Sequence, residues 1–154
     1  MAEFESKIHP QFKEIAAAIK KNDAYSLSVA LDNFNGNINE DLIDGDTALH
    51  YACENYSQSC FEPLHEAVDI NVIKLLFNVR ATNLDGINKM LKSVDIAGKT
   101  PLHQAAIYGN AKVVKLLLDF GASTEITDYN GKIPWDLAKP NSNIRRILEE
   151  NDED

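Results

Sequence analysis

An internal repeat is the feature that most constrains how this chain can fold. The segment at residues 95–106 (Asp-Ile-Ala-Gly-Lys-Thr-Pro-Leu-His-Gln-Ala-Ala) returns 33 residues later, beginning at Asp128. An earlier copy covers residues 45–52, and its Thr47 lies 53 residues before Thr100, so this unit holds about 20 additional residues. A repeat of this length predicts a stack in which each unit buries its apolar face against its neighbours.

The most regular unit, residues 95–127, predicts a turn followed by two helices. Residues 95–98 form a tight turn, because glycine tolerates a positive φ and aspartate bonds its own backbone. Thr100 is placed to cap a first helix that begins at Pro101, where a missing N–H costs nothing. A strongly apolar second helix is expected over residues 113–118, and Gly121 is expected to end it as a left-handed cap.

This unit resembles an ankyrin repeat. The pattern is Asp-x-x-Gly-x-Thr-Pro-Leu-His-x-Ala-Ala, then Gly-Asn, Val-Val-x-Leu-Leu-Leu and Gly-Ala. Looser units follow the same plan at about 9–42, 43–94 and 128–150. The resemblance implies an all-α ankyrin repeat solenoid of about four helix-turn-helix units, joined by short turns or hairpins, in a single domain over residues 1–154. Residues 151–154 are expected to be an acidic tail.

The unit at 43–94 is expected to carry its additional residues in two insertions. The first, at 56–68, falls between the two helices of the unit. The second, at 78–93, contains Ile87, Met90 and Leu91, whose spacing predicts an extra helical turn. A stack tolerates both as loops, because loop length costs little entropy. The alternative is that they build a second, apolar contact surface, and the sequence leaves both interpretations open.

The resemblance also implies a function. Ankyrin repeats bind proteins through a concave face formed by first helices and turn tips, which predicts a non-catalytic adaptor, inhibitor or chaperone-like binder. No phosphate-binding loop or catalytic motif is found, so neither an enzyme nor a cofactor is expected. Tyrosines and Ile107 lie among carboxylates, which favours a protein partner with a Lys/Arg-rich segment. The residues carried over by position are Asp44, Asp46, Tyr51, Glu54, Asn55, Ile96, Ala97, Lys99, Gln104, Ile107, Tyr108, Tyr129, Asn130 and Lys132.

A small zinc-binding protein is the alternative hypothesis. His50, Cys53, Cys60 and His65 lie within sixteen residues and have the side chains of a tetrahedral zinc site. Their spacing departs from the usual paired pattern, however. His50 and His103 occupy the same position in the repeat, so each is expected to bond the backbone of a neighbouring turn. Cys53 falls where the next unit has an alanine, which indicates a small buried side chain.

Charge and composition exclude other classes of function. Twenty-four acidic against fifteen basic residues give a net charge of −9, which disfavours nucleic acid and anionic membranes. The acidic amino end lacks the apolar core of a secretory signal, and no apolar run approaches the length of a membrane-spanning helix. Two cysteines cannot form a disulfide framework. The chain is therefore expected to be intracellular, in the cytoplasm and/or nucleus, and to be a monomer by itself.

Overall fold

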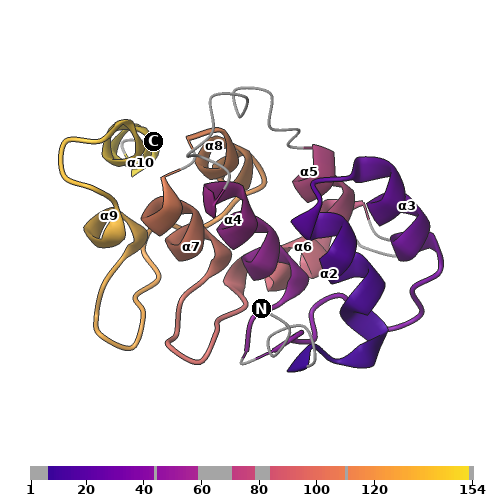
Figure 1. Cartoon of the computed structure of the whole chain (residues 1–154). Helices are drawn as coiled ribbons and strands as arrows, with labels where there is room; N and C mark the ends of the chain where they lie inside the picture. Colours follow the sequence, from indigo (N-terminus) through magenta and orange to yellow (C-terminus); the bar gives the residue numbers. More distant parts are fainter. Residues whose placement is uncertain (1–6, 44, 59–70, 79–83, 110, 153–154) are drawn as a thin grey trace.

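The computed structural model describes residues 7–43, 45–58, 71–78, 84–109 and 111–152. Within these ranges four helix pairs stand side by side, with the first helix of each pair in one row and the second helix in another (Figure 1). The pairs are α2 (Lys13–Lys20) with α3 (Ala24–Asp32), α4 (Ala48–Gln58) with α5 (Asn71–Phe77), α7 (Pro101–Tyr108) with α8 (Ala111–Asp119), and α9 (Pro134–Leu137) with α10 (Asn143–Asp152). A 3-10 turn, η1 (Pro10–Phe12), precedes α2, and no strand occurs in the described ranges. The predicted all-α stack is confirmed.

The hydrophobic core runs through all four pairs. Each pair contributes apolar side chains to one continuous cluster, because neither helix of a pair can cover its apolar face alone. The largest fully buried apolar residues are Phe12, Ile15, Ile19, Leu27, Leu49, Ile73, Leu76, Leu102, Leu117 and Leu148. Small residues such as Ala105 and Ala106 are also buried and let α7 approach its neighbours closely.

Two hairpin turns connect the later pairs and have the same internal geometry. In the turn at 95–99, Oδ1 of Asp95 accepts hydrogen bonds from the backbone N–H groups of Ala97 (2.9 Å) and Lys99 (3.0 Å). In the turn at 128–132, Asp128 accepts equivalent bonds, both of 2.9 Å, from the backbone of Asn130 and Lys132. The repeated aspartate therefore shapes each turn with its own side chain, as its position in the repeat predicts.

The caps of the third pair follow the sequence expectation. Thr100 accepts a hydrogen bond on Oγ1 from the backbone N–H of His103 (3.3 Å), and Pro101 takes the first helical position of α7. Gly109 ends α7 with φ of +76°, and Gly121 follows the end of α8 with φ of +100°. Left-handed glycines at these points leave the last carbonyls of each helix satisfied by local bonds.

The second insertion forms more structure than the sequence predicts. In place of one extra turn, residues in this block form a nine-residue helix, α6 (Leu84–Lys92). Met90 and Leu91 are buried against the core, while Asp85 and Lys89 are exposed. An amphipathic segment that buries one face is stabilised along its whole length, which explains the longer helix. In the first insertion, residues 56–58 end α4, and residues 59–68 lie outside the described residues.

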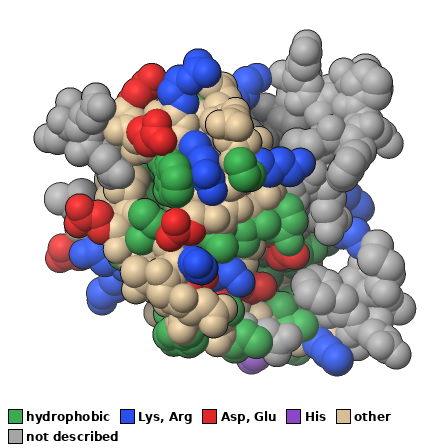
Figure 2. Space-filling view, turned by 90° about the vertical axis from the view of Figure 1, so that its left-hand side faces the viewer, with side chains coloured by type: hydrophobic (Ala, Val, Ile, Leu, Met, Phe, Trp, Pro, Cys, Tyr) green, Lys and Arg blue, Asp and Glu red, His purple; other side chains and the backbone are tan. Residues whose placement is uncertain are grey.

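The carboxyl-terminal end of the stack is closed by a helix with a charged outer side. Helix α10 extends to Asp152, so residues 151–152 of the predicted acidic tail are helical, while 153–154 lie outside the described residues. Trp135 donates from Nε1 to Oε1 of Glu149 (3.0 Å), and the Arg145 guanidinium lies 3.8 Å from its ring centroid. Figure 2 shows acidic, basic and apolar side chains interspersed on this end. Trp135 therefore closes the last pair, half-buried.

Candidate protein-binding face

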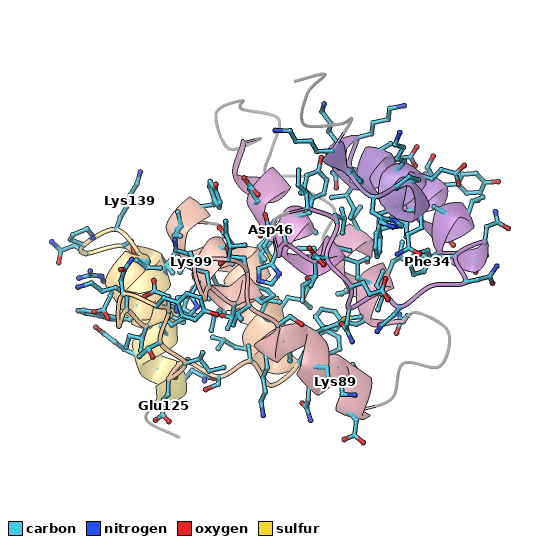
Figure 3. The ribbon with its side chains drawn as sticks, turned by 90° about the horizontal axis from the view of Figure 1, so that it is seen from below. Phe34, Asp46, Lys89, Lys99, Glu125 and Lys139 are labelled. Carbon is cyan, nitrogen blue, oxygen red and sulfur yellow. The ribbon has the colours of Figure 1, made fainter. Side chains whose placement is uncertain are left out.

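The residues predicted to bind a partner lie on the hairpin tips and on the row of first helices. We call this surface the front face and define it by the hairpin tips at 95–99 and 128–132 and by the outer sides of α4 and α7. In Figure 3, where the stack is seen from below, Asp46 and Lys99 lie near its middle. Ile96, Tyr129, Asn130 and Lys132 are exposed; Asp46, Glu54, Ala97, Lys99, Gln104, Ile107 and Tyr108 are half-buried. Asp44 and the side chain of Asn55 lie outside the described residues.

Two large apolar side chains are exposed at the hairpin tips. Ile96 is 72% exposed and Tyr129 is 73% exposed. Contacts between the two hairpins hold Tyr129 in place: its backbone N–H donates to the carbonyl of Ala97 (3.0 Å), and its ring lies against Gly98. A rigid aromatic side chain that is exposed in the free protein loses little entropy when a partner covers it. The tips therefore present a preorganised apolar contact.

Replacing Gly98 tests how Tyr129 is held. Gly98 has φ of +80°, and a Cβ at this position would lie 2.6 Å from Cδ1 of Tyr129. We expect Gly98→Ala to displace the ring and to cost more than Gly131→Ala, whose φ is +76° but whose Cβ would meet nothing within 4 Å. The control carries only the backbone strain, about 1–2 kcal/mol. Urea unfolding and the NMR shifts of the Tyr129 ring measure both effects; equal costs and unchanged shifts would contradict the ring contact.

A tyrosine and a carboxylate join the two central first helices. The Tyr108 hydroxyl donates to Oε1 of Glu54 (3.3 Å), which links α7 to α4. Burial and the nearby carboxylates of Glu54 and Asp46 raise the pKa of the Tyr108 hydroxyl. Burial is the largest cause of this shift, and the two carboxylates add to it because they disfavour the anionic form of the tyrosine.

Tyr51 differs from the sequence expectation. It was predicted to lie on the partner-binding surface, but the structure leaves it only 7% exposed. Its helix, α4, lies between α2 and α7 and contacts both, so most sides of the helix are covered. The Tyr51 ring therefore belongs to the core and is not an exposed anchor.

The two repeated histidines connect neighbouring units, as predicted. Nε2 of His50 lies 2.8 Å from the carbonyl oxygen of Lys99, and Nε2 of His103 lies 2.9 Å from that of Lys132. A carbonyl only accepts, so Nε2 carries the proton in both rings. Nδ1 of each ring then accepts a hydrogen bond from the backbone N–H of the threonine that caps its helix. The distance is 3.3 Å from Thr47 to His50 and 3.0 Å in the equivalent pair of α7. Burial lowers the pKa of both histidines. Each is a neutral structural link.

Of the four residues of the zinc hypothesis, two fall within the described residues. His50 uses both ring nitrogens in the bonds above, and Cys53 is buried, which raises the pKa of its thiol and disfavours a thiolate ligand. Cys60 and His65 lie outside the described residues. In the described ranges no three His, Cys, Asp or Glu side chains are grouped to hold a metal ion. Zinc content measured on untagged protein would test the hypothesis for the whole chain.

Sequence reasoning missed two exposed apolar residues away from the front face. Tyr25 is 79% exposed and Val29 is 43% exposed, both on α3 at the amino-terminal end of the stack. The sequence indicated that both side chains are exposed, because their positions lie outside the helical stripe of core residues formed by Leu27, Ala30 and Leu31.

Among the helices that the structure describes, none is long and apolar enough to cross a bilayer.

Comparisons with known proteins show which family this chain is similar to. A family model for ankyrin repeats, in three copies, matches residues 64–154. Ankyrin repeat and SOCS box protein 9 of Homo sapiens is 28% identical over 114 residues, which is 73% of this chain and 31% of that protein. Tyrosine-protein kinase HTK16 of Hydra vulgaris is 34% identical over 117 residues, which is 66% of this chain and 16% of that protein. A putative ankyrin repeat protein of Rickettsia bellii is 34% identical over 86 residues, or 56% of this chain and 12% of that protein.

This chain thus spans about a third or less of the length of these relatives. The family model covers more than half of the chain, and the described helix pairs, threonine caps and hairpin turns follow the same repeat. The chain belongs to the ankyrin repeat family.

Proposed function

We propose that this chain is a protein-binding module that holds a basic segment of its partner on the front face. Ankyrin repeats are generally protein–protein interaction modules without catalytic activity. The observation that carries the finer proposal is the pair of exposed side chains at the hairpin tips, Ile96 and Tyr129, of which Tyr129 is held against Gly98. A few anchor residues supply most of the binding energy in protein interfaces, and tyrosine is enriched among them.

The charges around these anchors favour a basic partner. Asp46 and Glu54 border Tyr108 closely enough to raise its pKa, and the whole chain carries a net charge of −9. Lys99 and Lys132 lie on the same hairpins as Asp95 and Asp128, so the face is mixed in sign within a chain that is acidic as a whole. Such a surface steers a Lys/Arg-rich segment toward it and gives an association rate that falls as salt rises. We place the module in the cytoplasm or nucleus, where Cys53 stays a thiol.

Titration calorimetry with synthetic peptides tests the partner chemistry. The probes are a Lys/Arg-rich peptide with one aromatic residue and a peptide of equal length in which glutamates replace the basic residues. We expect binding of the basic peptide alone, with affinity that falls about tenfold between low and physiological salt. Absent binding, or binding that salt leaves unchanged, would overturn the proposal for a basic segment.

Tyrosine variants locate the bound peptide on the molecule. We expect Tyr129→Ser to weaken binding about tenfold or more, because the ring is an exposed anchor. Tyr25→Ser is the matched control, since Tyr25 is equally exposed but lies on α3 at the other end of the stack. Equal losses from both variants would show that the peptide binds without using the front face.

A further inference from the structure

The amino-terminal end of the stack has an open groove of about 370 Å³ between α2 and α3. Ala18 and Ala30 form its buried floor, and the exposed side chains of Tyr25 and Val29 form one wall. Only residues of the first helix pair and its turn line the groove, and this pair stands at the right-hand end of the row in Figure 1. The terminal units of a repeat stack usually carry a polar outer face. At this end Tyr25 and Val29 are exposed beside the charged side chains of Glu14 and Lys21.

The order of charges along α2 is self-complementary. Glu14, Ala17 and Ala18 of α2 and Lys21, the helical residue that caps its end, all line the groove at the spacing that places them on one stripe. An acid thus stands at one end, a base at the other, and two alanines between them. When two such helices pack antiparallel about a twofold axis, Glu14 of each copy faces Lys21 of the other, and the alanines let the backbones approach.

The charge of the first helix pair favours a second copy of this chain as the occupant of the groove. Residues 13–32 contain Lys13, Lys20 and Lys21 against Glu14, Asp23 and Asp32, so this helix pair has no net charge. The net charge of −9 therefore lies entirely on the remainder of the chain. Two copies repel one another least when they meet at this end, because the rest of each molecule then lies far from the contact.

We propose that the groove between α2 and α3 is a self-association surface, on which a second copy of this chain packs α2 against α2 in antiparallel fashion with two reciprocal Glu14–Lys21 pairs. Tyr25 and Val29 of each copy add apolar contact at the edge of the groove. The end of one helix pair is small, so the dimer is weak, with a dissociation constant on the order of 100 μM. This proposal is independent of the front face, and it modifies the sequence expectation of a monomer by adding association at high concentration.

Charge reversal on the full chain tests the proposal by analytical ultracentrifugation. We expect the unaltered chain to form dimers as its concentration rises. In each reciprocal pair, Glu14→Lys sets two cations against one another, and Lys21→Glu sets two carboxylates against one another. Each single variant is therefore expected to dimerise at least about tenfold more weakly. An equimolar mixture of the two variants is expected to recover the dimer, because each variant then presents the charges that the other one needs.

Matched controls separate the groove from general charge effects. Glu125→Lys and Lys115→Glu make the same charge changes at exposed positions outside the first helix pair and are expected to leave the dimer unchanged. Circular dichroism establishes that all variants are folded. A chain that stays monomeric up to millimolar concentration would overturn the proposal. So would a dimer that tolerates both single variants, or a mixture of the two that remains monomeric.

Discussion

Replacing Leu117 with alanine is expected to lower the free energy of unfolding by about 2–5 kcal/mol. Leu117 is fully buried in α8, so the substitution removes apolar area and leaves a cavity that the neighbouring helices fill only in part. Each helix pair shares its core with the next pair. Because the stack has few pairs, the lost packing at Leu117 lowers the stability of the whole chain. Urea unfolding followed by circular dichroism measures the change.

The adjacent leucine is the control for this substitution. Leu118 is partly exposed and packs on the edge of the core, so Leu118→Ala is expected to cost less than Leu117→Ala. A shift in the melting temperature of only a degree or two for Leu117→Ala would show that this residue does not carry the core of the third pair.

Stability is expected to fall as the pH is lowered from about 6.5, because of His50 and His103. Both are ordinary histidines in the unfolded chain, with a pKa of 6.5, but burial lowers their pKa in the folded chain. Below pH 6.5 the unfolded chain therefore binds protons that the folded chain does not. The free energy of unfolding falls by up to about 1.4 kcal/mol per pH unit for each histidine, until the pH reaches the folded pKa. Well above about pH 6.5 both histidines are neutral in the folded and the unfolded chain, so their titration does not change the free energy of unfolding.

The charged groups around the two rings do not reverse this sign. The carboxylates of Asp95 and Asp128 favour the charged imidazoles, whereas Lys99 disfavours the charged form of His103, and burial is the largest cause for both rings. Lowered pKa values at Asp23 and Asp128 act only in more acidic solution, near and below pH 4.

Urea unfolding between about pH 7.5 and pH 5 measures the dependence. The slope is expected to shrink in His103→Gln, which removes one of the two titrating groups. His9→Gln is the control, because His9 is exposed and lies outside the repeated motif. A stability that stays constant over this range would contradict the neutral, buried state of both rings.

Much of the local structure follows from the sequence because it depends on neighbouring residues. Asp95 shapes its own turn, Thr100 caps the helix that begins one residue later, and Gly109 ends that helix. These interactions span only a few residues, so a motif contains nearly all of the information. The roles of His50 and His103 were also predictable, because the repeat places a hairpin carbonyl beside each ring.

The repeat by itself determined that this chain is a stack of helix pairs, and only the tertiary structure decided which surfaces remain free. Tyr51 has the sequence position of a surface residue and is buried, because α2 and α7 cover both sides of its helix. Residues 84–92 of the second insertion form a helix because the core accepts Met90 and Leu91. The groove beside Tyr25 is open because, among the described residues, only α2, α3 and the turn between them line it. Exposure is a property of packed neighbours, and residues distant in the sequence supply those neighbours.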